Sequence, residues 1–453
     1  AQARAGYAPI ATIGRDGPLA LSFAQQRLWF IDRLEGGSAQ YNLPVALRLR
    51  GELDETALQQ ALDALIARHE VLRTRYAEVD GVAVQRIQPA TALAIARHDL
   101  RGLDASAREA RLQQYAADEA VRLFDLSRDL MLRCTLLQLD RHDHAALFTL
   151  HHIASDGWSS GVLVREFVAL YGALVQGRPP VLPALAVQYA DYAHWQRERL
   201  QGPLRQSQLQ YWREQLAGLP VVHNLPLDKP RPAQQRFEGA RVEQVLEAPL
   251  LAALNALARR HDASLFMLLQ AAFALLLSRW SGESDIVIGT PIAGRLHPDV
   301  EPLIGFFVNT LVLRSDLSAN PTFEQLLAQA RATALAAYEH QEIPFEMLVD
   351  ELRPVRSLSH APVFQIMLAL QNHEQVALEL PGLSLAALDS NAERAQFDLQ
   401  LVVTENTQGL RLSWFYASSL FEPASIERLG AAFVRLLQGI VAAPQTAVAQ
   451  LPL

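Results

Sequence analysis

The stretch 147–159 constrains the fold of this chain more than any other part of the sequence. It begins with the apolar run Leu147–Leu150, and two adjacent histidines, His151 and His152, follow directly. Asp156-Gly157 comes next, and apolar residues then recur at three- and four-residue intervals. This pattern predicts a strand, a turn and a helix. It places titratable side chains at the end of a strand, where they can face a substrate.

The two histidines are expected to have different roles. Adjacent residues of an extended strand point to opposite sides, so we assign His152 to the substrate side and His151 to the interior. Imidazole titrates near neutral pH, so His152 can accept or relay a proton from an attacking amine. Asp156 either orients that imidazole or forms an ion pair that fixes the loop. We favour the ion pair, with Arg73 and Arg295 as candidate partners.

The remaining residues near the histidines leave few chemistries open. Gly157 is either a simple turn glycine or a point where a thin substrate arm passes along the backbone. We expect no metal, because no Cys or Glu cluster accompanies the histidines and His142 and His144 lie in a predicted hairpin turn. We expect no covalent acyl-enzyme, and the sequence contains no phosphate-binding glycine loop. Direct transfer between two bound substrates is the simplest remaining reaction.

Composition excludes several classes of protein. The net charge of −8 argues against a nucleic-acid-binding protein, because such proteins usually carry a basic face. We expect no membrane span, because the longest apolar candidate, 265–277, contains Gln270 and is predicted to be a buried helix. The single cysteine, Cys134, cannot form an internal disulfide and lies in an apolar, strand-like run. We therefore expect a core residue and a reducing, cytoplasmic compartment.

Strands and helices alternate along the chain, which predicts an α/β fold. A length of 453 residues exceeds the usual size of one domain, and the order strand, helix pair, strand recurs in both halves. We therefore expect two related lobes with a cleft between them, cut from a longer polypeptide rather than free-standing. The expected divisions are a linker over 1–18, an N-terminal lobe over 19–180, a C-terminal lobe with its connector over 181–440, and a linker over 441–453.

Periodicity and capping residues predict the individual elements. Asp54 is the expected cap of a helix that ends near His69, and Ser264 is the expected cap of a second helix. Further helices are expected over 250–260, 323–338 and 425–441, and strands over 131–139, 145–150, 364–369 and 397–404.

The segment His151–Gly157 resembles the HHxxxDG motif of condensation domains of nonribosomal peptide synthetases, which also occurs in epimerization domains and related acyltransferases. Other core motifs of condensation domains have similar counterparts in the expected order, at Ser22–Trp29, Arg68–Thr74, Tyr189–Gln196, Ile288–Thr310, His340–Phe345 and Pro362–Gln365. The resemblance covers about residues 18–440.

This resemblance implies two chloramphenicol-acetyltransferase-like lobes that form a V-shaped pseudo-dimer with a central tunnel. It implies formation of an amide bond by attack of an acceptor α-amine on a donor thioester, with each substrate tethered to a phosphopantetheine arm. The implied partners are an upstream donor carrier domain, from which the linker 1–18 would come, a downstream acceptor carrier domain and an adjacent adenylation domain. We expect no cofactor bound by the domain itself, and a monomer within a larger synthetase.

The resemblance also assigns roles to residues. The central residue of the family matches His152, which acts as a general base or as a positioning group. Asp156 matches a structural position, and Gly157 matches the position that admits the donor arm. Further candidates line the substrate tunnel, namely Trp158, Ser159, Asn309 and Gln365. For Asn309, a substrate contact and a core hydrogen bond both stay open.

The subclass and the rival functions follow from finer features. Ser155, the form of the first block and the sequence Gly305–Thr310 resemble the subclass that joins a D-configured donor to an L acceptor. An epimerization domain is disfavoured, because the expected glycine- and tyrosine-rich block near the end is missing from the sequence. A non-catalytic recruiting module of the same fold is disfavoured, because such modules carry a degraded histidine motif.

Overall fold

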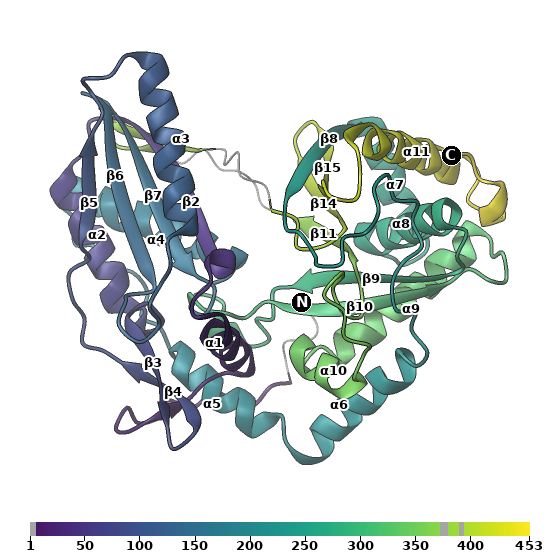
Figure 1. The fold of residues 1–453 in the computed structure, drawn as a ribbon, viewed down its shortest axis with the longest axis horizontal. Coiled ribbons are helices and arrows are strands. Elements are labelled where there is room, and N and C mark those ends of the chain that lie inside the picture. Colours follow the sequence, from purple (N-terminus) through teal and green to yellow (C-terminus); the bar gives the residue numbers. More distant parts are fainter. Residues whose placement is uncertain (1–5, 372–378, 389–393) are drawn as a thin grey trace. The chain divides into compact units, whose positions relative to one another are not determined.

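The computed structural model describes residues 6–371, 379–388 and 394–453. The chain forms two compact units (Figure 1). Unit 1 comprises residues 1–202, 293–308 and 376–392, and unit 2 comprises residues 203–292, 309–375 and 393–453. The first boundary therefore lies later than the expected position at residue 180. The structure also corrects the predicted divisions by returning two short later segments to unit 1.

Unit 1 is built on a mixed six-stranded sheet in the order β12-β13-β2-β7-β6-β5. Its strands are β2 (Asn42–Gly51), β5 (Ile95–Asp99), β6 (Leu132–Asp140), β7 (Asp143–His151), β12 (Glu379–Leu380) and β13 (Leu383–Ala387). A smaller sheet contains β1 (Leu19–Ala20), β4 (Val82–Ile87) and β3 (Thr74–Val79). Since β13 pairs with β2, the segment 379–387 belongs to this unit despite its distance along the chain.

Helices cover both faces of the large sheet of unit 1 (Figure 1). The α-helices are α1 (Phe23–Glu35), α2 (Glu55–Arg68), α3 (Ala105–Val121), α4 (Gly157–Val175) and α5 (Tyr189–Arg199), and the short 3-10 helices are η2 (Ala39–Tyr41), η3 (Glu70–Arg73) and η4 (Pro298–Val300). Alternation along β7 places Phe148 and Leu150 in the core under α2 and α4. Leu147 instead packs with Leu112 of α3 on the opposite face. The centre of β7 is therefore buried on both faces.

Unit 2 repeats the plan with a mixed six-stranded sheet in the order β10-β9-β11-β14-β15-β8. Its strands are β8 (Gly239–Glu247), β9 (Asp285–Ile292), β10 (Asn309–Asp316), β11 (Ile366–Gln371), β14 (Leu399–Asn406) and β15 (Gly409–Ala417). Its helices are α6 (Gly202–Gln215), α7 (Ala248–Arg260), α8 (Leu265–Ser281), α9 (Phe323–Glu339), α10 (Phe345–Leu352), α11 (Pro423–Ala442) and the short η5 (Val448–Gln450). The expected recurrence of one plan in two lobes is thus present within the two units.

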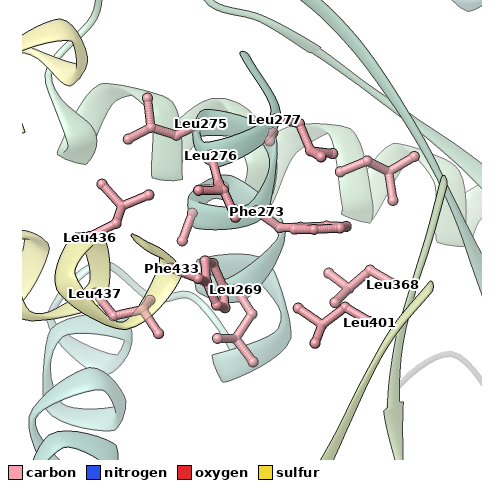
Figure 2. Packing of buried hydrophobic residues seen from close by; sticks show 14 of the residues in the cluster. Leu269, Phe273, Leu275, Leu276, Leu277, Leu368, Leu401, Phe433, Leu436 and Leu437 are labelled. Carbon is pink, nitrogen blue, oxygen red and sulfur yellow. The ribbon is translucent and has the colours of Figure 1, made fainter. Parts of the chain in front are cut away.

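The core of unit 2 lies between this sheet and the helices α7, α8, α9 and α11. Figure 2 shows Phe273 of α8 and Phe433 of α11 within this core, with ring centroids 6.2 Å apart. Both rings are fully buried and pack edge to face, the arrangement that aromatic pairs favour. The predicted buried helix around 265–277 is confirmed as the centre of this core.

Most predicted helices agree with the structure to within two residues. Asp54 and Ser264 cap α2 and α8 as expected. Each side chain accepts a hydrogen bond from the backbone N–H of the residue three positions later. His144 was placed in a hairpin turn, which is wrong. The turn contains only residues 141–142, and His144 is a buried residue of β7. Cys134 is a core residue as predicted, and burial raises the pKa of its thiol to about 12.

The terminal segments and the connector pack against their units instead of forming free linkers. Arg15 forms ion pairs with Glu70 and Asp191 at 2.9 Å, which ties the segment 6–18 to unit 1. At the other end, Leu451 is buried in the core of unit 2. In the connector, Arg231 lies 2.7 Å from the buried Asp398. Long-range ion pairs and apolar contacts therefore override the linker-like composition of these segments.

Among the residues that the structure describes, one helix meets the length and hydropathy expected of a membrane span, which the sequence pattern did not predict. This helix is α4, and half of its most apolar window is buried inside the protein. The bent pair α7–α8 meets the same criteria when its two helices are taken together. The core helices of a folded domain have the same composition, so this finding carries little weight.

Candidate active site

The histidine motif folds as the predicted strand, turn and helix. Strand β7 ends at His151, His152 begins the turn, and α4 begins at Gly157. Asp156 is the N-cap of α4, because its Oδ1 accepts a hydrogen bond of 2.9 Å from the Ser159 N–H. The backbone N–H of His152 donates to the Tyr41 carbonyl at 2.9 Å. The turn is therefore held at its beginning and at its end.

His151 is an interior residue with only 1% of its surface exposed. Its Nδ1 accepts a hydrogen bond of 3.0 Å from the Ile153 N–H, so the neutral ring carries its proton on Nε2. The ring also packs edge-on against Phe124, with centroids 5.5 Å apart. Burial lowers the pKa of His151 to about 3, and the charges of His152 and Arg133 act in the same direction. His151 therefore stays neutral near pH 7 and supports the turn.

His152 is only partly buried and lies at the open end of the strand. Its ring packs on the ring of Phe306, with centroids 4.3 Å apart. Burial lowers the pKa of His152 below its ordinary value, while the negative charge of Asp156 opposes this shift. The imidazole is therefore predominantly neutral at pH 7, the form that can accept a proton. The two histidines occupy different environments, as their positions on the strand predicted.

The carboxylate of Asp156 is buried and fully engaged. Its Oδ2 accepts hydrogen bonds from the N–H groups of Phe307 and Val308 at 2.9 and 3.0 Å. Arg295 lies 3.6 Å from its Oδ1, which already accepts the Ser159 bond. In the described part of the chain, no hydrogen bond joins Asp156 to the His152 ring. The geometry therefore favours the loop-fixing ion pair over a catalytic triad.

Arg295 carries the second buried charge of this cluster. Its guanidinium donates to the backbone oxygens of Val300 and Leu303 at 2.8 and 2.6 Å, and to the Ser159 hydroxyl at 2.8 Å. Burial lowers the pKa of Arg295 to about 10, and the nearby Asp156 carboxylate opposes this shift. Arg295 therefore stays charged at neutral pH and organises the segment 293–308 around Asp156.

Two of the candidates next to Asp156, Gly157 and Trp158, are exposed. Gly157 is exposed, and among the described residues no atom lies within 4 Å of the position that a Cβ would take, apart from its chain neighbours and the nearby backbone of α4. Trp158 is 37% exposed, and the Arg295 guanidinium lies 5.7 Å from the centre of its ring. Open space therefore lies beside the N-terminus of α4, next to an aromatic ring.

The structure corrects several site candidates. Arg73 does not pair with Asp156, because its guanidinium donates to the carbonyls of Ile66, Ala67 and Gln88. The Ser159 hydroxyl is buried and engaged with Gly305 as well as Arg295.

The two other polar candidates also have partners within the protein. Asn309 donates to the carbonyls of Gln341 and Ile343 and accepts a bond from the Phe345 N–H. The Gln365 amide donates to the carbonyls of Val221 and Ala361 and accepts from the His223 N–H. Their polar atoms stabilise backbone segments of unit 2. This geometry favours the core hydrogen bond over a substrate contact for both side chains.

Sequence reasoning missed the residues that surround His152. Phe306 lies within the motif block Ile288–Thr310, which predicts no role for it, although its ring contacts the His152 imidazole. The Tyr189 hydroxyl donates to the Phe306 carbonyl at 2.7 Å, and the two residues are far apart in sequence. The sequence does contain a local capping pattern, Ser-x-x-Gln, at Ser22 and Gln25. This pattern predicts the start of a helix but not a connection to His152.

The described residues contain no group of three or more His, Cys, Asp or Glu side chains placed to hold a metal ion. Oxygen and nitrogen donors are instead distributed among ion pairs and helix caps. The candidate site is therefore composed of His152, Gly157 and the aromatic rings beside them.

A family model for the condensation domain matches residues 16–453. The chain belongs to the condensation-domain family. The match confirms the predicted resemblance to condensation domains of nonribosomal peptide synthetases.

A linear gramicidin synthase of Brevibacillus parabrevis is 48% identical over 443 residues, which cover 97% of this chain and 9% of that protein. This condensation domain therefore spans about a tenth of that relative. The X-domain from teicoplanin biosynthesis has a similar structure, with a TM-score of 0.87, 33% identity, and coverage of 98% of this chain and 100% of that one. A four-domain nonribosomal peptide synthetase, AB3403, matches with a TM-score of 0.83 and 25% identity over 98% of this chain and 34% of that one.

The buried ion pair predicts a large loss of stability in Asp156→Ala. The substitution removes a helix cap, leaves two backbone N–H groups without an acceptor and leaves Arg295 charged and buried. We expect the free energy of unfolding to fall by about 3–5 kcal/mol, measured by urea denaturation. Asp99→Ala removes an ion pair in which both side chains are about half exposed, and should leave the melting temperature nearly unchanged. An Asp156→Ala domain of wild-type stability would refute this account.

The low pKa of His151 predicts a pH dependence of stability. An unfolded histidine has a pKa of about 6.5, so between about pH 6 and pH 3 the unfolded state binds a proton at residue 151 that the folded state does not. Stability therefore falls as the pH is lowered through this window. In His151→Asn, whose amide oxygen can accept the Ile153 bond, the slope of unfolding free energy against pH should decrease by up to about 1.4 kcal/mol per pH unit. An identical slope in both proteins would contradict the assignment.

Proposed function

We propose that this condensation domain is an acyltransferase that uses His152 to join an acceptor α-amine to a donor thioester. The observation that carries the proposal is the intact histidine motif, in which a partly buried, neutral imidazole lies at the end of β7. The open space beside Gly157 supports access of a thin substrate to the same turn. The V-shaped arrangement and the tunnel implied by the family stay predictions.

The proposed reaction conserves atoms and charge. The nitrogen lone pair of the neutral acceptor amine attacks the thioester carbonyl, a C–N bond forms, and the C–S bond breaks. The amine loses one proton, and the departing thiolate gains one. A free α-amine has a pKa of about 7.7–8.0, so a substantial fraction is already neutral near pH 8. His152 therefore orients the amine and accepts or relays the proton released from the new amide nitrogen.

The substrates are proposed to arrive on phosphopantetheine arms of carrier domains, one as donor and one as acceptor. The relatives are long synthetases, and AB3403 is described as a four-domain enzyme, which supports neighbouring carrier and adenylation domains. Gly157 is the proposed entry point of the donor arm, and Trp158 is a candidate lining residue. We further propose a donor of D configuration and an acceptor of L configuration. A cytoplasmic location is part of this proposal and is supported by the buried, unpaired Cys134.

A recruiting role is the second candidate. A solved structure contains an X-domain in complex with OxyB, and this X-domain is 33% identical to the chain with a TM-score of 0.87. That similarity supports a surface that could dock a partner. The complete histidine motif and the depressed pKa of His152 favour catalysis, because docking alone requires neither of them.

We expect His152→Ala to reduce peptide transfer between loaded carrier domains by at least about 100-fold, because an acid–base or orienting group is removed from the reaction centre. Mass spectrometry of the acceptor carrier measures the product, with donors loaded with either the D or the L amino acid. His194→Ala is the matched control, since His194 lies on the surface in an exposed pair with Glu198. Full activity of His152→Ala would remove this residue from the mechanism.

Enlarging Gly157 should obstruct the donor more than the acceptor. Gly157→Leu adds a side chain in open space, so the domain should fold normally while the apparent KM for a soluble donor thioester rises about tenfold or more. The KM for the acceptor should change by less than about twofold, because the added side chain weakens binding of the donor alone. Gly157→Ala is the control for the loss of glycine itself. Equal losses for both substrates would contradict the donor-entry assignment.

A further inference from the structure

The ring of His152 depends on a neighbour from a distant part of unit 1. His152 follows the last residue of β7, so the strand itself does not fix the orientation of the imidazole. Phe306, in the segment 293–308, supplies a contact at a centroid distance of 4.3 Å and an interplanar angle of 57°. The orientation of the imidazole is therefore coupled to the position of Phe306.

Tyr189 fixes the backbone at Phe306. Its hydroxyl donates to the Phe306 carbonyl at 2.7 Å, and its ring is 99% buried against Phe307, with centroids 5.1 Å apart. A Cβ on Gly305 would lie 2.3 Å from a ring carbon of Tyr189, so this ring packs directly on the backbone before Phe306. Asp156 holds the N–H groups of the next two residues, but Tyr189 holds the Phe306 carbonyl itself.

Tyr189 is also connected, through Ser22 and Gln25, to the backbone that follows His152. Its hydroxyl lies 2.8 Å from Ser22 Oγ, and because the tyrosine proton is donated to Phe306, Ser22 is the donor to Tyr189. Ser22 and Gln25 form the capping box of α1. The Gln25 amide donates to the Ile153 carbonyl at 3.4 Å, directly after His152. A series of contacts therefore starts from the His152 imidazole and ends at the carbonyl of the next residue, Ile153.

The titratable and charged groups around this network have distinct effects. Burial raises the pKa of Tyr189 well above its ordinary value, so its hydroxyl remains a donor at neutral pH. Asp156 raises the pKa of His152, and burial of the ring lowers it. His151 is neutral, and Arg295 is charged but directed at backbone oxygens. Loosening the Phe306 contact would hydrate the imidazole and move its pKa up towards the ordinary value.

We propose that Tyr189 is a positioning residue for His152, which acts by holding the Phe306 carbonyl so that the Phe306 ring keeps the imidazole oriented towards the acceptor amine. The inference rests on the proposed function of His152. It assigns a task in the reaction to a fully buried tyrosine on α5 that touches no substrate.

The test is Tyr189→Phe in the complete domain, which keeps the ring and removes only the hydroxyl. We expect kcat for peptide transfer to fall at least tenfold, while the KM values for soluble donor and acceptor thioesters change less than twofold. The titration of His152, followed by NMR of protein labelled with 13C-histidine, should shift towards pH 6.5. The acidic limb of the kcat profile should shift in the same direction, because a His152 of higher pKa is protonated at higher pH.

Tyr171→Phe is the matched control. Tyr171 is also fully buried in unit 1, and its hydroxyl accepts a single hydrogen bond from the Asp54 N–H at 2.9 Å. This variant should lose a comparable amount of thermal stability and retain wild-type kcat and His152 titration. Equal losses of kcat in both variants, or an unchanged His152 titration in Tyr189→Phe, would overturn the proposal.

A second variant keeps the proposal testable if Tyr189→Phe does not fold. Ser22→Ala removes the other contact of the Tyr189 hydroxyl, and it should shift the His152 titration in the same direction. Thr322→Ala removes the equivalent capping box of α9 in unit 2, and it should leave that titration unchanged. A Ser22→Ala titration identical to wild type would overturn the proposal. The NMR readout is independent of transfer activity, so an inactive wild-type domain would refute the proposed function without deciding the role of Tyr189.

Discussion

The buried carboxylate of Asp156 accepts hydrogen bonds from three backbone N–H groups in two segments of unit 1, and Arg295 lies 3.6 Å away. A buried charge is stable only when its donors are all in place, so this group fixes the turn after β7, the first turn of α4 and the segment 293–308 together. This arrangement fixes the backbone positions of Gly157 and His152. The chemistry of the site therefore depends on an ion pair that takes no part in the proposed bond formation.

The two adjacent histidines illustrate how environment separates side chains of the same type. His151 is enclosed, and burial lowers its pKa to about 3, while its Nδ1 accepts a hydrogen bond from the backbone. His152 is partly exposed, packs on Phe306 and is influenced by the negative charge of Asp156. Only His152 combines access with a neutral ring near pH 7.

Three of the tunnel candidates share one feature. Ser159, Asn309 and Gln365 are polar residues within family-like motifs, and each side chain binds the backbone of a neighbouring segment. Residue type alone does not distinguish a polar residue that stabilises the fold from one that contacts a substrate. Both roles use the same hydrogen-bond donors and acceptors. Tyr189 presents the reverse case, since this buried side chain contacts only protein and yet is connected through Phe306 to His152, the proposed reaction centre.

The sequence alone determined the strand, turn and helix around the histidines, the caps at Asp54 and Ser264, and the buried character of α8 and Cys134. These features depend on neighbours within a few residues, so periodicity and capping chemistry predict them. Only the tertiary structure decided that Arg295, not Arg73, faces Asp156. It likewise decided that two short segments return to unit 1, that Phe306 packs on His152 and that Tyr189 donates to the Phe306 carbonyl. Such contacts depend on how distant segments pack and satisfy buried polar groups, and no local pattern along the chain contains that information.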